Sequence, residues 1–237
     1  MLLHWFDTLA ARLPARCEVC RTWPAQPVCG DCLQSFAAPV ARCPRCARPV
    51  DAHSPDLGKP CSDCLRAPPP LDRCHAALAY AFPWPQLIAR FKFRAEPGWA
   101  RTFAGLMRAA PGAAQALQVA DRVLPLPLGP ERLAQRGYNQ ALELARRLAP
   151  GKVDTRSLLR WRETDPQTSL DRSHRLGNVQ GAFRVDPTHA ARLRGTHLLL
   201  IDDVMTSGAS LFAAAAALRR AGAASVSALV LARTPEA

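Results

Sequence analysis

The sequence lacks the glycine-rich signatures of the common nucleotide-binding folds. It has no G-x-G-x-x-G, which a dinucleotide-binding fold would carry. Its two Gly-Lys pairs, at 58–59 and 151–152, do not continue into a Walker P-loop. It also has no apolar run of 18 residues, so we expect no transmembrane helix. These absences argue against a dinucleotide-binding fold, a P-loop nucleotide-binding protein and a membrane-spanning protein, so the function has to be inferred from other motifs.

Lysine is scarce as well, since only Lys59, Lys92 and Lys152 occur among 31 basic residues. Arginine therefore supplies nearly all of the formal net charge of +12. A coding bias towards arginine explains part of this excess. A partner rich in phosphate, either a nucleotide or a nucleic acid, is the functional interpretation. Because the arginines are scattered along the chain, charge alone does not choose between the two.

The first 16 residues contain one short apolar stretch, which His4 and Asp7 interrupt, so they make a poor signal peptide. Apolar residues between positions 2 and 13 fall at helical spacing, which predicts an amphipathic helix over residues 1–16 that packs on the protein. A membrane-surface helix would need more length and more apolar area.

The most informative stretch is THLLLIDDVMTSGASLF, residues 196–212. The run from Leu198 to Ile201 has no polar alternation, as expected for a strand buried on both faces of a parallel sheet. Asp202 and Asp203 follow at once, then a turn rich in small and hydroxyl residues, then a helix from Leu211 to Arg220. Ligands of open α/β sheets bind at the carboxyl ends of strands, and helix N-termini attract phosphate. The pattern predicts a phosphate site with two carboxylates beside it.

Two other interpretations of this stretch fit less well. Phospho-receiver domains also carry an acidic pair at a strand end, but they place it early in the chain, whereas only one further strand-like run remains here, from Ser225 to Leu231. An ordinary buried strand followed by an aspartate that caps a helix would not need both the acidic pair and the hydroxyl-rich turn.

The cysteines give a second, independent signal. Eight of the nine cysteines form four C-x-x-C pairs, and two thiolates at this spacing can hold one tetrahedral ion. Disulfides are disfavoured without a secretory signal, and paired knuckles around short turns suit zinc better than an iron–sulfur cluster. We therefore expect two structural Zn²⁺ ions, held by Cys17, Cys20, Cys29, Cys32, Cys43, Cys46, Cys61 and Cys64.

The pairing of the knuckles is open between a sequential and an interleaved arrangement. We prefer the sequential one, with the first four cysteines on one ion and the last four on the other, because shorter loops cost less entropy to close. His53 is expected to be a solvated loop residue, and Cys74 a small buried residue of the first strand.

Elements after the cysteines alternate between strands and helices. Strands are predicted at 76–82, 122–126, 198–201 and 226–231, and helices at 85–93, at 101–110, after the Pro-rich turn through Leu148, and at 211–220. This order predicts an α/β fold, a parallel sheet with helices on both faces. The expected domains are the helix of 1–16, a double zinc ribbon at 17–65, a Pro-rich linker at 66–75 and an α/β domain at 76–237.

Two further segments contain residues suited to binding. In 123–141 a strand leads into a loop stiffened by Pro127 and its neighbours, followed by Arg132 and Arg136, whose i, i+4 spacing suits a solvated helix face equally well. The polar segment 164–183, with Arg172, His174, Arg175 and Asn178, is either a lid or an ordinary surface loop.

The acidic stretch resembles the ribose-phosphate signature of type I phosphoribosyltransferases. The resemblance implies that Asp202 and Asp203 contact the ribose hydroxyls of phosphoribosyl pyrophosphate, directly or through Mg²⁺. It also implies that the following loop holds the 5-phosphate, with the residues Val204, Met205, Thr206, Ser207, Gly208, Ala209 and Ser210. Lys92, Pro127, Arg132, Arg136, Arg172, Arg175 and Asn178 are the candidates for the pyrophosphate or substrate side.

The whole order of motifs is similar to that of the competence protein F family. It comprises the cysteine knuckles, a segment around Lys92, P-L-P followed by R-G-Y-N-Q, an R-x-x-R-x-x-N-V segment and finally L-I-D-D-V-x-T-S-G-A-S. Ser207 stands where a second threonine is common, and it keeps the hydroxyl. The family joins a double zinc ribbon to a phosphoribosyltransferase domain and is associated with DNA uptake. The resemblance implies a cytoplasmic protein acting with single-stranded DNA and a DNA-import helicase.

Two classes of function follow from the resemblance. The chain is either an enzyme that transfers a phosphoribosyl group to an acceptor, or a non-catalytic module that senses a ribose phosphate and binds single-stranded DNA or a helicase. The fold does not separate them, because one fold hosts many functions.

Overall fold

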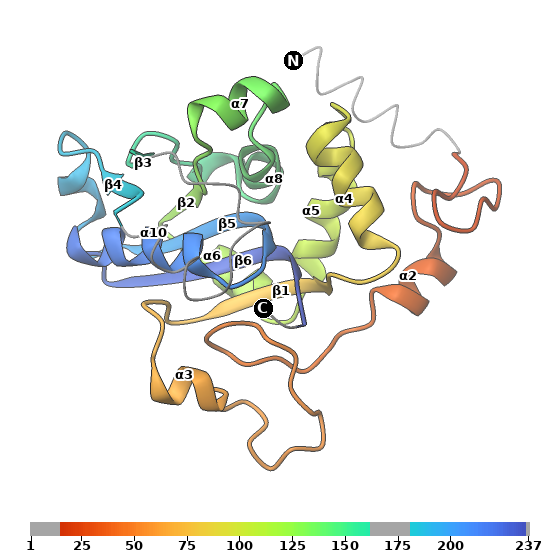
Figure 1. Ribbon diagram of the computed structural model, residues 1–237, viewed down its shortest axis with the longest axis horizontal. Coiled ribbons are helices and arrows are strands. Elements are labelled where there is room, and N and C mark those ends of the chain that lie inside the picture. Colours follow the sequence, from red (N-terminus) through yellow and green to blue (C-terminus); the bar gives the residue numbers. More distant parts are fainter. Residues whose placement is uncertain (1–14, 162–180, 236–237) are drawn as a thin grey trace. The chain divides into compact units, whose positions relative to one another are not determined.

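The computed structural model describes residues 15–161 and 181–235 (Figure 1). The chain separates into two compact units, Met1–Ala38 and Pro39–Ala237, and each is treated by itself. The predicted helix of 1–16 and most of the polar segment 164–183, with Arg172, Arg175 and Asn178, lie outside the described residues.

The described part of the first unit contains α2 (Gly30–Phe36). The described part of the second unit contains, in chain order, α3 (Ser62–Arg66), β1 (Cys74–Ala79), α4 (Trp84–Phe93), α5 (Trp99–Ala109), α6 (Ala113–Val119), β2 (Arg122–Pro125), α7 (Pro130–Arg136), α8 (Gln140–Leu148), η1 (Pro150–Lys152), β3 (Leu158–Arg160), β4 (Phe183–Val185), η3 (Ala190–Leu193), β5 (His197–Met205), α10 (Ala209–Arg220) and β6 (Ser225–Arg233).

Four strands form the central sheet, in the order β1-β6-β5-β2. All three pairings are parallel, as the alternation of strands and helices predicts. Strand β5 is internal, with Leu198 opposite Arg122 on one side and Val226 on the other. Its carboxyl end, where Asp202 and Asp203 lie, therefore sits beside the ends of two neighbouring strands.

Helices cover both faces of the sheet, as predicted (Figure 1). Leu198 and Leu200 of β5 pack in one apolar cluster with Leu211 and Leu218 of α10. Leu199 and Ile201 of β5 are equally buried, and they point to the opposite face because side chains alternate along a strand. Helices α5 and α8, which contact each other and the strands, cover that face. Burial on both sides explains why β5 reads as an uninterrupted apolar run.

The prediction of one helix through Leu148 was wrong. Two helices, α7 and α8, occupy the region, and Gly137 ends the first with a φ of 75°. This left-handed conformation suits glycine and terminates a helix. Asn139 then caps α8, since its side chain accepts a hydrogen bond from the Leu142 amide. The break turns the segment 137–140 towards the end of the sheet.

An antiparallel pair of short strands, called the β3–β4 hairpin below, was not predicted. Strands β3 and β4 pair antiparallel outside the main sheet, and β4 contacts α10. Three residues are too few to show a period of two, so no pattern in the sequence predicts these strands. In the ranges 15–161 and 181–235, no helix is long and apolar enough to cross a membrane.

Candidate functional site

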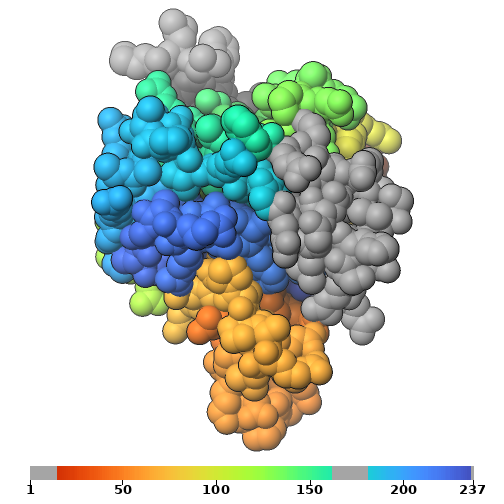
Figure 2. Space-filling view, turned by 60° about the vertical axis from the view of Figure 1, so that its left-hand side comes forward, coloured from red at the N-terminus to blue at the C-terminus, as the bar shows by residue number. Residues whose placement is uncertain are grey.

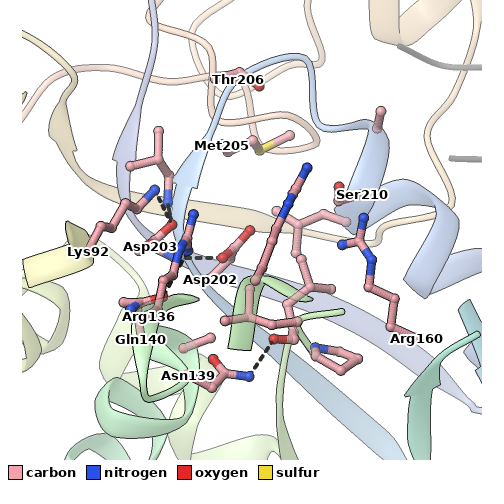
Figure 3. Close-up of a pocket in the computed structure, with 18 of the residues that line it drawn as sticks. Lys92, Arg136, Asn139, Gln140, Arg160, Asp202, Asp203, Met205, Thr206 and Ser210 are labelled. Atoms are coloured by element: carbon pink, nitrogen blue, oxygen red, sulfur yellow. Dashed lines mark hydrogen bonds and ion pairs between the residues drawn. The ribbon is translucent and has the colours of Figure 1, made fainter. Parts of the chain in front are cut away.

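A cavity of about 570 Å³ lies at the carboxyl ends of β2 and β5 (Figure 3). It brings together most of the residues predicted from three separate segments of the chain. Its lining includes Lys92, Pro127, Arg132, Arg136, Asp202, Asp203, Val204, Met205, Thr206, Gly208, Ala209 and Ser210. Ser207 is the one residue of the predicted loop that does not line this cavity, and it is buried.

The acidic pair is held by its own backbone and by a lysine. Asp202 accepts a hydrogen bond from the Asp203 amide at 2.9 Å, and Asp203 accepts one from the Val204 amide at 2.6 Å. Lys92 of α4 forms an ion pair with Asp203, with 2.8 Å between Nζ and Oδ1. The side chains of Lys92 and Asp203 are 17% and 8% exposed, so the pair is largely shielded from solvent. Asp202 remains the less neutralised member of the acidic pair.

The charge of one carboxyl group affects the pKa of the other. Burial of the Asp202 carboxyl, with the neighbouring negative charge of Asp203, raises the pKa of Asp202 to about 7. The positive charge of Lys92 acts in the opposite direction but is outweighed. A carboxyl with such a pKa changes its charge near neutrality, so a cation or hydroxyl-rich ligand would bind best once it is ionised.

The loop after β5 has the shape of an anion site. Gly208 has a φ of +84°, and a Cβ built there would lie 2.5 Å from Met205 Cε and 2.7 Å from Phe212 Cζ. The left-handed φ favours glycine at this position, and any Cβ would require the Met205 and Phe212 side chains to move. The loop leads directly into α10, a helix of 12 residues whose first three residues line the cavity. The backbone amides and the positive end of the dipole at a helix start favour a phosphate.

The opposite wall is built by the R-G-Y-N-Q segment. Arg136 donates to the buried Gln140 side chain at 2.9 Å, and Gln140 in turn donates to the Tyr138 carbonyl at 3.3 Å. Asn139 donates to the Leu126 carbonyl at 3.0 Å, which joins the start of α8 to the loop after β2. Tyr138 donates its hydroxyl proton to the Phe91 carbonyl in α4. The motif thus shapes the wall, and its arginine faces the cavity (Figure 3).

Sequence reasoning missed some residues of the cavity. Arg160, from the unpredicted hairpin, lines it, and so do Tyr80, Phe93 and Gln140. The guanidinium of Arg160 stacks over the buried ring of Phe183, with its central carbon 5.4 Å from the ring centroid. No motif marked Arg160, because its place in the cavity depends on a pairing between residues 23 positions apart, Arg160 and Phe183.

The eight knuckle cysteines form two groups in the predicted sequential arrangement. Cys17, Cys20, Cys29 and Cys32 make one group and Cys43, Cys46, Cys61 and Cys64 the other, with the sulfur atoms of each within 4.8 Å of one another. Sulfur separations include 3.8 Å for Cys17 to Cys32 and 3.8 Å for Cys46 to Cys61. Tetrahedral thiolates about 2.3 Å from zinc stand about 3.8 Å apart, so both groups fit structural zinc.

The two groups repeat one local design. The amide of Cys29 donates to Cys17 Sγ and that of Cys61 donates to Cys43 Sγ, both at 3.3 Å. In each group the third cysteine also immediately precedes a short helix, α2 or α3. With four sulfur ligands each, the groups leave no open coordination position, which agrees with a structural role.

The second cysteine group belongs to the unit that carries the sheet. Cys43, Cys46 and Cys64 pack in the same apolar cluster as α10 and the strands. In Figure 2 the orange segment that contains this group adjoins the blue segment that includes α10. His53, in the loop of this group, is exposed, and Cys74 is buried in β1, both as predicted.

Arg233 links this cysteine group to the loop of the cavity. It lies at the end of β6 and is 2% exposed. Its Nε donates to the Cys46 carbonyl at 3.0 Å, and its Nη1 donates to the Met205 carbonyl at 3.2 Å and to the Thr206 carbonyl. One buried guanidinium therefore fixes the position of the loop against the knuckle.

The fold and the site define a phosphoribosyltransferase-type domain. The family model described as "Phosphoribosyl transferase domain" matches residues 133–237, which include the R-G-Y-N-Q segment, the acidic pair and the loop. The match covers the part of the chain that forms most of the cavity.

Similar proteins extend this result to the cysteine-rich region. The chain is 32% identical over 235 residues to DNA utilization protein YhgH of Salmonella typhimurium, covering 94% of this chain and 98% of that protein. It is 31% identical over 238 residues to the protein of the same name in Escherichia coli K12, with the same coverage. It is also 31% identical to competence protein F of Haemophilus influenzae, over 68% of this chain and 73% of that one. The chain belongs to the competence protein F family.

The pKa of Asp202 predicts a pH-dependent stability. Between about pH 4 and pH 7 the folded chain keeps a proton that the unfolded chain releases, so this group lowers stability as pH rises through that window. Without added Mg²⁺, Asp202→Asn should leave the free energy of unfolding nearly unchanged at pH 4 and raise it by on the order of 2 kcal/mol at pH 8. Denaturant titration at both pH values measures this, with the exposed Asp56→Asn as control; an equal effect at both would contradict it.

The burial of the second cysteine group predicts unequal effects of ligand loss. Cys46→Ser should remove one zinc and lower the stability of the sheet-bearing unit by roughly 3 kcal/mol or more, because Cys46 packs in its core. Cys20→Ser, in the first unit, should remove one zinc without that loss. Metal analysis and melting curves report both quantities. Fewer than two zinc ions in the folded wild type, or equal melting temperatures in the two variants, would overturn the assignment.

The contacts of Arg233 predict a large effect of its removal. Arg233→Met leaves buried carbonyls of Cys46, Met205 and Thr206 without this donor, which should cost about 3 kcal/mol or more. Arg233→Lys should lose less, and Arg220→Met, at an exposed position of α10, should be nearly neutral. Urea unfolding measures the three variants. Equal stability of the two methionine variants would refute the link.

Proposed function

We propose that the chain binds phosphoribosyl pyrophosphate, or a related ribose phosphate, together with Mg²⁺ in the cavity, and that it serves DNA uptake. The observation that carries the proposal is that the acidic pair and the glycine-containing start of α10 open into one cavity. The two features suit the two ends of one ligand, hydroxyls at the carboxylates and a phosphate at the helix start.

The rest of the cavity suits a pyrophosphate group. In the proposed complex the 5-phosphate lies at the 206–210 loop and the ribose hydroxyls donate to Asp202 and Asp203. The pyrophosphate then extends towards Arg132 and Arg136, which line the opposite wall. Guanidinium groups are well matched to phosphate oxygens. Mg²⁺, when bound, would neutralise pyrophosphate charge that Lys92 and the arginines leave uncompensated.

The biological setting is proposed from the relatives. The names of proteins that match over most of this chain refer to DNA utilization and to competence. A net charge of +12 favours a polyanionic partner. We propose a cytoplasmic protein that acts on or beside imported single-stranded DNA, with a DNA-import helicase as partner.

Ligand binding can be tested by thermal unfolding. Phosphoribosyl pyrophosphate with Mg²⁺, at about 100 times its dissociation constant, should stabilise the chain by about 2.7 kcal/mol and raise the melting temperature by about 5 °C or more. The double variant Asp202→Asn, Asp203→Asn should lose this shift, while the Asp56→Asn control keeps it. No shift in the wild type over a broad concentration range would contradict the proposal.

A second measurement separates an enzyme from a sensor. Transfer displaces pyrophosphate from C1 of the ribose, and the positive charge that develops on the sugar would be stabilised by the nearby carboxylates. An enzyme should therefore release pyrophosphate with Mg²⁺ and a suitable acceptor, and the double variant should not. Intact binding without turnover across a broad panel of acceptors would assign the sensor function.

A further inference from the structure

The β3–β4 hairpin carries two arginine–aromatic stacks on its two faces. Arg160 and Phe183 are paired in register, and Arg160 lines the cavity. Trp161 follows β3 directly and continues the ladder, since its amide donates to the Ala182 carbonyl at 2.8 Å. Because side chains alternate along a strand, Trp161 points to the face opposite Arg160.

The outer stack is exposed. Trp161 is 63% exposed, and the guanidinium carbon of Arg184 lies 4.7 Å from the centroid of its ring. Arg184 is itself exposed and pairs in register with Leu159, which is 38% exposed. These three residues, Leu159, Trp161 and Arg184, are called the hairpin platform below. The arginine orients the indole before any partner arrives, which reduces the entropy cost of binding.

The local charges favour an anionic partner. Arg184 supplies an exposed cation within the platform, and Arg156, three residues before Leu159 in the chain, is exposed as well. Two acids close in sequence, Asp154 and Asp186, already have local partners: Asp154 accepts hydrogen bonds from Ser157 and lies 3.7 Å from the Arg122 guanidinium, and Asp186 accepts hydrogen bonds from Thr188. An exposed aromatic ring with an arginine beside it is a combination that binds unpaired bases and the phosphates between them.

We propose that the hairpin platform is a binding site for single-stranded DNA, in which one unpaired base stacks on Trp161 and Arg184 contacts the adjacent phosphate. The site rests on the DNA-handling part of the proposed function and names residues for it. It is separate from the ribose-phosphate cavity, because the platform side chains do not line that cavity. A duplex binds less well there, since its bases are already stacked and paired.

The test uses the full chain and a fluorescent oligothymidine, with binding followed by anisotropy at several salt concentrations. Trp161→Ala should weaken binding about tenfold or more, and Trp161→Phe should keep most of the affinity. Trp23→Ala is the matched control, because Trp23 is also exposed, at 58%, but lies in the first unit. Arg184→Gln should lower the slope of the logarithm of the binding constant against the logarithm of the salt concentration by about 1. Arg220→Gln, at the end of α10, should change this slope less.

The outcomes separate this site from the ligand cavity. Trp161→Ala should retain the full thermal shift with phosphoribosyl pyrophosphate, which shows that the variant is folded and the cavity intact. Equal affinity of wild type and Trp161→Ala would overturn the platform while leaving the cavity proposal standing. Equal affinity for single strands and duplex would overturn base stacking. Absence of any DNA binding at low salt would also overturn the platform.

Discussion

Strand β5 is hydrogen-bonded along both edges, and the position of the site depends on this double pairing. With β2 on one side and β6 on the other, β5 cannot shift its register without breaking two ladders. Its apolar residues are buried on both faces, which adds a second constraint. The aspartates near the carboxyl end of the strand are therefore held in one place, and Gly208 turns the chain so that α10 begins beside them.

The second cysteine group and the cavity are parts of one structure. The group packs in the core with α10, and Arg233 donates to carbonyls on both sides of the junction. In this chain the second cysteine group is therefore more than an appended module, because it supports the loop proposed to hold phosphate. The first group lies in the other compact unit and has no such described role.

The sequence allowed prediction of the parts that rest on local pattern. The buried run before Asp202, the parallel alternation and the sequential cysteine groups are all confirmed. The break between α7 and α8 and the β3–β4 hairpin were not predicted. Gly137 acts through a left-handed turn that glycine permits but does not require, and Arg160 reaches the cavity only through pairing with a distant strand. Arg233, at the end of an apolar strand, showed no sign in sequence of its contacts with Cys46 and Met205. The roles proposed for the site residues remain predictions.

The position of the bound ligand tests the account most directly. A crystal structure of the chain with phosphoribosyl pyrophosphate and Mg²⁺ should show the 5-phosphate at the 206–210 loop, the ribose hydroxyls at Asp202 and Asp203, and the pyrophosphate towards Arg132 and Arg136. Density for the ligand elsewhere, or with its phosphate away from the start of α10, would contradict it.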